Sequence, residues 1–187
     1  MSTKKAHTEM TPRQHFEKEV MPQIQKELGI KNPMAVPKLL RVHVNVGIGK
    51  RLKLSKDFSD VEKNVSLITG QKPVVTRARI SISNFKVTKG SPNGLTVTLR
   101  GDRMYDFIYR LVNAVFPRIR DFRGISPRAF DGRGNYAVGL QDASVFPEIN
   151  PEDITNMHGL QINIITSAKD NDSAKALLKV LKFPFRK

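Results

Sequence analysis

Residues 117–149 read PRIRDFRGISPRAFDGRGNYAVGLQDASVFPEI, and this stretch decides what kind of fold the chain can form. Its glycines and prolines are too frequent for one long helix. Arginines are interleaved with aromatic residues along it, and the series is Arg118, Arg120, Phe122, Arg123, Arg128, Phe130, Arg133, Tyr136 and Phe146. A guanidinium group fits a phosphate, and an aromatic face stacks on a base or on an arginine. Because the aromatic residues argue against disorder, we expect an ordered, basic contact surface, with an arginine-rich solvated connection as the alternative that the spacing leaves open.

The charge of the chain points to a polyanionic partner. The 187 residues include 32 Lys and Arg against 17 Asp and Glu, which gives a net charge of +15. Nucleic acid is the most frequent partner of such a protein, and an anionic membrane is the competing one. The sequence has no run of about 18 apolar residues, so we expect no membrane-spanning segment. Residues 77–133 hold twelve basic and four acidic residues, which makes the middle of the chain the expected electrostatic footprint.

Catalytic and metal-binding chemistry is not indicated by the sequence. The chain has no Cys, which excludes disulfides and thiolate ligands and fits a cytosolic protein. None of the four His residues stands at metal-ligand spacing with a carboxylate. Asp131 begins a segment that is superficially similar to a calcium loop, but Arg133 stands where that loop requires an acid. We therefore expect no enzyme activity, no metal and no cofactor.

Alternation and helical periodicity predict the elements outside this stretch. Val42 and Val44 alternate with polar residues, as in a strand with one buried face. Met104, Phe107 and Leu111 recur at helical spacing. The predicted elements are a helix over 11–29 kinked at Pro22, a strand over 38–46, a helix over 59–70, strands over 73–79 and 95–100, a helix from 101 that Pro117 ends, a strand over 160–164 and a helix from about 172.

Three local details follow from the same patterns. Ser59 and Glu62 are spaced as a capping box. The Pro-Asn-Gly sequence at 92–94 predicts a turn. Asp106 and Arg110 are spaced to pair on the outer face of their helix.

The order of these elements predicts an α+β fold. Strands and helices are mixed without regular βαβ spacing, so we expect a mostly antiparallel sheet with helices packed on one face and a long Arg/Gly-rich loop segment. Residues 11–187 would form a single domain after a flexible basic tail at residues 1–10. The second face of the sheet collects uncharged hydrogen-bonding groups, namely Asn45, Thr96, Thr98, Gln161 and Asn163. Such groups suit shape-based contacts to RNA, and an antiparallel sheet also shows polar residues to water; the sequence leaves both interpretations open.

Ordered motifs along the chain closely resemble the large-subunit ribosomal protein L5 family, in its bacterial form. These motifs are NVGIG at 45–49, GQKPVVTRAR at 70–79, VTLRGDRM at 97–104, RDFRG at 120–124, FDGRGNY at 130–136, FPEI at 146–149 and FPFRK at 183–187. They follow the family's order over roughly residues 12–187. The resemblance implies a non-catalytic structural constituent of the ribosome, in the cytoplasm, that anchors 5S rRNA in the central protuberance of the large subunit.

The resemblance also implies sites and partners. The residues that match the family's contacts to 5S rRNA are Asn45, Gln71 and Thr98. The loop that matches the family's contact to peptidyl-site tRNA contains Arg77, Arg79, Lys86 and Lys89. Further contacts, to large-subunit rRNA or to a protein of the small-subunit head across an intersubunit bridge, are expected at Arg120, Arg123, Arg133, Asn135 and Tyr136. Charge alone supports an alternative, a general basic RNA-binding or chaperone protein that acts off the ribosome.

Overall fold

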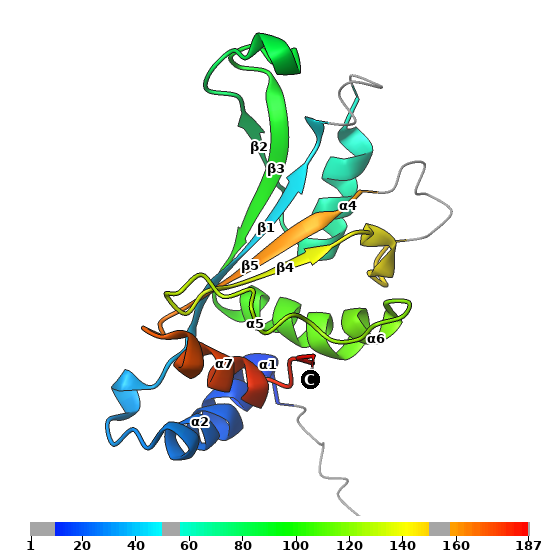
Figure 1. The fold of residues 1–187 in the computed structure, drawn as a ribbon. Helices are drawn as coiled ribbons and strands as arrows, with labels where there is room; N and C mark the ends of the chain where they lie inside the picture. Colours follow the sequence, from blue (N-terminus) through cyan, green and yellow to red (C-terminus); the bar gives the residue numbers. More distant parts are fainter. Residues whose placement is uncertain (1–9, 50–56, 150–157, 187) are drawn as a thin grey trace, which may run out of the picture.

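The fold is built on one antiparallel sheet of five strands. The computed structural model describes residues 10–49, 57–149 and 158–186, so nearly all of the predicted basic tail at residues 1–10 lies outside the described residues. The strand order is β2-β3-β1-β5-β4 (Figure 1), and each neighbouring pair is antiparallel. The strands are β1 (Leu39–Gly47), β2 (Val74–Arg77), β3 (Pro92–Leu99), β4 (Tyr136–Leu140) and β5 (Leu160–Thr166). This arrangement confirms the predicted α+β fold with its antiparallel sheet.

The helices gather against the sheet and at one of its ends. In Figure 1, α1, α2 and α7 cluster at the end opposite the protruding tip of β2 and β3, and α5 runs below the sheet. The helices are α1 (Pro12–His15), α2 (Met21–Leu28), α4 (Ser59–Thr69), α5 (Asp102–Arg110), α6 (Phe116–Arg118) and α7 (Asn171–Val180). The π-helical turns are η1 (Phe16–Val20) and η4 (Leu111–Val115), and the 3-10 turns are η2 (Pro33–Ala35), η3 (Ser83–Phe85) and η5 (Ala143–Val145).

The core lies on one face of the sheet because side chains alternate along each strand. Val42 and Val44 of β1 are 0% and 1% exposed. Val44 lies opposite Val97 of β3 and Ile162 of β5, both of which are buried as well. The residue between the two valines, His43, points to the other face and is only half-buried. One face of the sheet thus packs in the hydrophobic core, and the other face remains open to contacts with a partner.

Two helices accommodate a proline by a π-helical turn. The turn η1 precedes Pro22 and the turn η4 precedes Pro117. In η4, the N–H of Phe116 donates to the carbonyl of Leu111, five residues earlier. Proline lacks an N–H and its ring crowds the carbonyl four residues before it, and the wider π turn relieves that contact. The prediction that Pro117 ends its helix is therefore wrong, because the helix continues through Arg118 as α6.

The stretch predicted as one long loop contains a strand. Tyr136, Val138 and Leu140 of β4 are buried, and the residues between them face the other side of the sheet. β4 pairs with β5 along its whole length and forms the edge of the sheet. The Arg/Gly-rich segment is thereby divided into a part before β4 and a part after it, and both are tied to the sheet.

Two predictions at the starts of elements are also wrong. Residues 92–94 begin β3 and do not form a turn. An added Cβ at Gly94 would lie 3.0 Å from the carbonyl oxygen of Val46 in β1, so the glycine lets β3 and β1 approach closely at this point. Ser59 is the first residue of α4, and its N–H donates to Oδ1 of Asp57 at 2.9 Å. The expected capping box between Ser59 and Glu62 is therefore not formed.

The predicted pair between Asp106 and Arg110 is replaced by a longer-range one. Arg110 pairs through Nη1 with the carboxylate of Glu148, and its Nη2 donates to the carbonyl of Ile68 at 3.3 Å. Both partners are only partly exposed, at 38% and 23% of their side chains. One side chain of α5 therefore joins the end of α4 to the segment that follows β4.

Candidate nucleic-acid interface

Two rows of polar side chains cross the open face of the sheet. His43 lies opposite Thr98 of β3 on one side and Asn163 of β5 on the other. Asn45 lies opposite Thr96 and Gln161 in the same way. Opposed residues in antiparallel strands hold their side chains within contact distance. The sheet therefore brings together Asn45 and Thr98, two of the three residues predicted to bind 5S rRNA.

Cross-strand hydrogen bonds fix the orientation of these groups. The hydroxyl of Thr96 donates to Oδ1 of Asn45 at 2.7 Å. The hydroxyl of Thr98 is 2.8 Å from Nδ1 of His43. Because Oδ1 of Asn45 already accepts a hydrogen bond, its Nδ2 group remains to donate to a partner. The face is consequently a preorganised set of donors and acceptors. These side chains are already ordered in the free protein, so binding a ligand costs less conformational entropy.

His43 adds no positive charge to this face at neutral pH. Partial burial lowers the pKa of His43 below 6.5, and the charges of Arg41 and Arg100 lower it further. A neutral imidazole has one donor and one acceptor nitrogen. The centre of the face is therefore uncharged and hydrogen-bonding, with arginines nearby, and this arrangement suits the sugar and base edges of RNA more than a bare phosphate.

Gln71, the third residue predicted to bind 5S rRNA, lies in the connection between α4 and β2. Its N–H donates to the hydroxyl oxygen of Thr69 at 3.3 Å, and that hydroxyl donates to the carbonyl of Gln71 at 3.0 Å. Thr69 is 3% exposed, so the backbone of Gln71 is held from within the core. Since Val74 lies opposite Thr96, residues before Val74 lie toward Thr98 in the antiparallel pair. Gln71 itself lies outside the two rows of polar side chains, in the connection that leads into β2.

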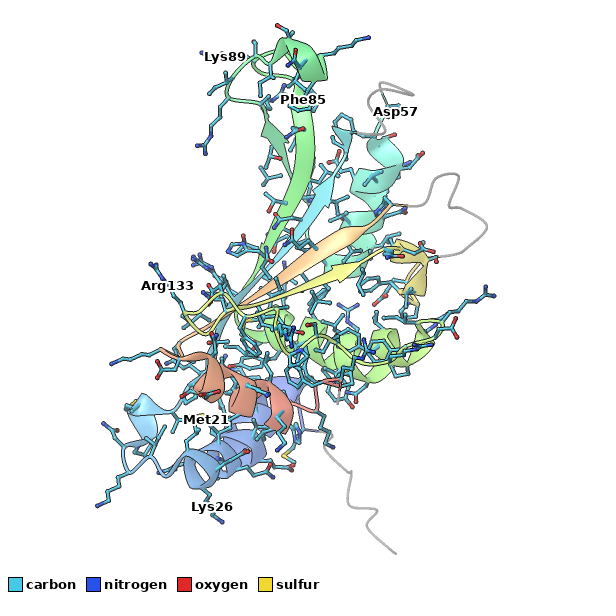
Figure 2. The ribbon with its side chains drawn as sticks, viewed as in Figure 1. Met21, Lys26, Asp57, Phe85, Lys89 and Arg133 are labelled. Atoms are coloured by element: carbon cyan, nitrogen blue, oxygen red, sulfur yellow. The ribbon has the colours of Figure 1, made fainter. Side chains whose placement is uncertain are left out.

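The predicted tRNA loop forms the protruding tip between β2 and β3. Figure 2 shows Phe85 and Lys89 at this tip, far from the helical end of the molecule. The loop is closed by a bridge between Ile82 and Val87, and Lys86 holds a left-handed backbone with φ 55°. Phe85 is 63% exposed.

All four basic residues of the loop are exposed, and one of them also has a hydrogen-bond partner within the protein. The guanidinium of Arg77 donates to the carbonyl of Gly90 at 3.0 Å and so braces the base of the loop. Arg79, Lys86 and Lys89 are exposed. The sequence did not indicate that Ile80 would be 72% exposed beside them. The loop therefore combines four exposed cations with exposed apolar groups.

The arginines and the aromatic residues of 117–149 separate in the structure. Phe116 and Phe122 stack at 5.5 Å, and Phe130 packs against Tyr136 at 4.7 Å between ring centroids. Arg120 and the other arginines of this stretch remain on the surface. Within residues 10–49, 57–149 and 158–186, no ion pair occupies the guanidinium groups of Arg118, Arg120, Arg123, Arg128 and Arg133.

Asp131 shapes the segment that precedes β4. Its Oδ1 accepts the N–H groups of Arg133 at 2.8 Å and Asn135 at 3.0 Å, and its Oδ2 accepts Nδ2 of Asn135 at 2.6 Å. The side-chain hydrogen bond from Asn135 is the main cause that lowers the pKa of Asp131. Asn135 also accepts the N–H of Thr166 through Oδ1 at 3.2 Å. These contacts hold the loop so that Arg133 projects outward (Figure 2).

Tyr136 supports this loop from the core. Its side chain is 2% exposed, and its hydroxyl donates to the carbonyl of Ser126 at 2.6 Å. Burial raises the pKa of Tyr136 to about 12. Among the residues predicted to contact rRNA or the bridge, three have side chains that are exposed and free, namely Arg120, Arg123 and Arg133. The polar side-chain atoms of Asn135 and Tyr136 instead form hydrogen bonds within the protein.

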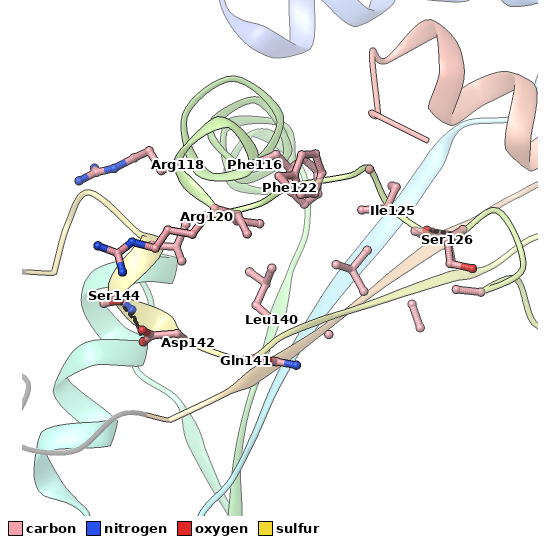
Figure 3. A pocket seen from close by; sticks show the side chains of 18 residues that line it. Phe116, Arg118, Arg120, Phe122, Ile125, Ser126, Leu140, Gln141, Asp142 and Ser144 are labelled. Carbon is pink, nitrogen blue, oxygen red and sulfur yellow. Dashed lines mark hydrogen bonds between the residues drawn. The ribbon is translucent and has the colours of Figure 1, made fainter. Parts of the chain in front are cut away.

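A groove of about 870 Å³ runs beside the arginines. Figure 3 shows Arg118 and Arg120 at its rim, with Leu140 and Phe122 toward its apolar floor. Asp142 also lines this groove, and its Oδ1 accepts the N–H of Ser144 at 2.9 Å. The described part of the chain contains no cluster of His, Asp and Glu that could hold a metal ion. Among the same residues, no helix is long and apolar enough to cross a membrane.

A preorganised polar sheet face with exposed arginines nearby is the arrangement typical of the class of proteins that bind a polyanion. The comparisons with known proteins give this class a family. The family model described as Ribosomal protein L5 matches residues 32–87, and a second model, which describes the C-terminus of the same ribosomal family, matches residues 92–185. The chain belongs to the ribosomal protein L5 family.

Curated relatives match the chain over almost its whole length. The large ribosomal subunit protein uL5 of Thermotoga maritima is 49% identical over 175 residues, which cover 92% of this chain and 94% of the relative. The protein of the same name from Thermosipho africanus is 49% identical over 94% of this chain and 97% of its own. The one from Dictyoglomus turgidum is 48% identical over 94% and 98%. The resemblance in the sequence motifs is thus confirmed. As a member of this family the chain is a structural, non-enzymatic ribosomal protein that binds rRNA.

Proposed function

We propose that this ribosomal protein binds 5S rRNA through the open face of its sheet and anchors it in the central protuberance of the large subunit. In the same proposal, the tip between β2 and β3 contacts peptidyl-site tRNA in the cytoplasmic ribosome. The arginines of 117–149 contact large-subunit rRNA and a protein of the small-subunit head across an intersubunit bridge.

The observation that carries the proposal for 5S rRNA is the pair of cross-strand hydrogen bonds on the polar face. Thr96 orients Asn45 at 2.7 Å, and Thr98 meets His43 at 2.8 Å. A face that only displayed polar residues to water would not need the amide of Asn45 held in one orientation. Fixed hydrogen-bonding groups between arginines can recognise one RNA shape while the charges supply general attraction.

The first experiment is a competition assay with the full chain and labelled 5S rRNA at about 0.15 M salt. Unlabelled tRNA and a scrambled RNA of equal length are the competitors. We expect 5S rRNA to be bound on the order of a thousandfold more tightly than either competitor. If all three RNAs compete equally, the exposed arginines alone account for binding. The chain would then act as a general RNA-binding protein whose affinity falls with salt by a log–log slope of about −0.7 to −0.9 per phosphate contact.

Matched variants separate the two surfaces. Asn45→Ala and Thr98→Ala remove groups of the polar face and should weaken the 5S rRNA complex. Lys86→Ala removes a charge from the distant tip and should leave that complex nearly intact. The tip variant should instead weaken binding to tRNA. Equal losses of all three variants on unrelated RNA would contradict the assignment of 5S rRNA to the sheet face.

A further inference from the structure

A small pocket lies where the polar face of the sheet meets the loop before β4. Its volume is about 290 Å³, just below the smallest pockets that hold drug-sized ligands, at about 300 Å³. It is too small for a helical stem and has the scale of one planar ring. The residues that line it are His43, Asn45, Ala129, Asp131, Asn135, Tyr136, Ala137, Asn163 and Ile165.

The polar atoms of this pocket that remain free are those of amides and an imidazole. In the described part of the chain, the side-chain amide of Asn163 has no hydrogen-bond partner, and Nδ2 of Asn45 has none either. His43 uses Nδ1 toward Thr98, so its other ring nitrogen is free. The carboxylate of Asp131 accepts three hydrogen bonds from its own loop. Beside this carboxylate, the pocket offers neutral donors and acceptors, which match the edge of a nucleobase.

Three arginines lie near residues that line the pocket. Arg41 and Arg100 lie close enough to His43 to lower its pKa, and Arg133 extends from the loop that forms one wall (Figure 2). A phosphate on either side of an inserted nucleotide would meet these arginines, while the edge of the base would meet the amides and the imidazole. Ile165 and Ala129 add apolar surface for the plane of a ring. An unpaired base of RNA combines these requirements in one ligand.

We infer that this pocket receives a single unpaired nucleobase, which the amides of Asn45 and Asn163 and the ring of His43 recognise through its edge. The inference rests on the proposed binding of 5S rRNA to the sheet face and adds a base-reading position to it. Sequence-specific RNA recognition uses such splayed bases because the edges of paired bases are hidden in an RNA helix. Asn163 becomes a specificity-determining residue that the family motifs do not include.

The test couples single abasic substitutions in 5S rRNA to variants of β5. Asn163→Ala removes an amide inside the pocket. Gln161→Ala removes an amide on the same strand and the same face, but Gln161 does not line the pocket. Ala137→Leu, opposite Asn163 on β4, fills the space without removing a polar group. Circular dichroism and thermal melting verify that each variant is folded.

We expect one unpaired position at which loss of the base weakens binding to the wild-type chain by about tenfold, the range of one well-made base contact. Removing the base at that position should no longer weaken binding to the Asn163→Ala and Ala137→Leu variants. It should still weaken binding to the Gln161→Ala variant. If the chain binds 5S rRNA selectively but no position couples to Asn163, the pocket is overturned and the proposed function stands. If the chain does not bind 5S rRNA selectively, both the proposed function and the proposed base pocket are overturned.

Discussion

The hydroxyl of Thr96 donates a 2.7 Å hydrogen bond to Oδ1 of Asn45, directly across the pairing of β3 with β1. Thr96 is therefore a positioning residue: it sets which way the amide of Asn45 faces. This relationship was not visible in the sequence, where the two residues are 51 positions apart.

The first prediction tests that positioning. Thr96→Val keeps the shape of the side chain but removes the donor, so the amide of Asn45 becomes free to rotate. A hydrogen bond of this kind contributes about 0.5–1.5 kcal/mol, so affinity for 5S rRNA should fall by about twofold to tenfold. Thr76→Val is the control, because Thr76 is an exposed residue of β2 with no bond to Asn45. Equal effects of the two variants in a binding titration would show that Asn45 does not depend on Thr96.

The second prediction concerns the loop before β4. Gly134 has φ +78°, and a Cβ there would lie 2.8 Å from the carbonyl oxygen of Ala168. Gly132 has φ +85°, but nothing lies within 4 Å of its added Cβ. Gly132→Ala should therefore cost about 1–2 kcal/mol for the left-handed backbone alone. Gly134→Ala should cost about 1–3 kcal/mol more, because the overlap displaces the backbone at Ala168.

The free energy of unfolding in denaturant measures both costs. The comparison isolates the contact with Ala168, since both variants carry the same kind of backbone strain. A loss for Gly134→Ala no larger than that for Gly132→Ala would mean that the segment at Ala168 moves aside freely. The loop would then not be held in one position against β5.

Most of the fold could be predicted because each element carries its own periodicity. The spacing of Met104, Phe107 and Leu111 was sufficient by itself to predict a helix. The alternation at Val42 and Val44 was sufficient to predict a strand. β4 was missed because its outward positions are Ala137 and Gly139, which give no polar alternation and whose glycine favours a loop. The buried set of Tyr136, Val138 and Leu140 was the signal that would have identified the strand.

The candidate site could be predicted only in part. The polar face followed from alternation, since Asn45 and Thr98 fall on the side opposite the valines. Gln71 came from the family resemblance alone, because its place depends on a long-range register. The role of Asn135 was predicted as a contact, yet its amide bonds Asp131 and the N–H of Thr166, 31 residues away. No local sequence pattern predicts a hydrogen bond between residues so far apart in the chain.

The third prediction concerns the ion pair of Arg110 and Glu148. Arg110→Ala leaves the carboxylate of Glu148 unpaired at a position where its side chain is only 23% exposed. Because the pair is partly buried, we expect a loss of about 1–3 kcal/mol in the free energy of unfolding, less than for a fully buried pair. Asp102→Ala breaks a solvent-exposed pair with Arg13 and should have a much smaller effect, because water and salt screen that pair.

Glu148→Gln provides the second arm of that test. It removes the charge while leaving an acceptor for Arg110, so its effect should lie between those of Arg110→Ala and Asp102→Ala. Chemical denaturation of the three variants at one pH gives the order. If Arg110→Ala were no more costly than Asp102→Ala, the link from α5 to the segment after β4 would contribute nothing to stability.

The last prediction follows from the lowered pKa of His43. Well above pH 6.5 the ring is neutral in both the folded and the unfolded chain, so its titration does not change stability with pH there. As pH falls below 6.5, the unfolded chain takes up the proton first, because burial and the charges of Arg41 and Arg100 oppose protonation in the fold. Stability should therefore fall between pH 6.5 and the folded-state pKa and then level off.

An NMR titration of the His43 ring and denaturation at about pH 7.5 and 5.5, on either side of the ordinary histidine pKa, measure this effect. The fall in stability between those pH values should be smaller in His43→Gln than in the wild-type chain, since the variant has no proton to gain at this position. Asp131, which lines the same pocket, is the acidic group there that would favour the charged ring. A His43 pKa at or above 6.5 would show that Asp131 outweighs the two arginines, and the polar face would then carry a charge in mildly acidic solution.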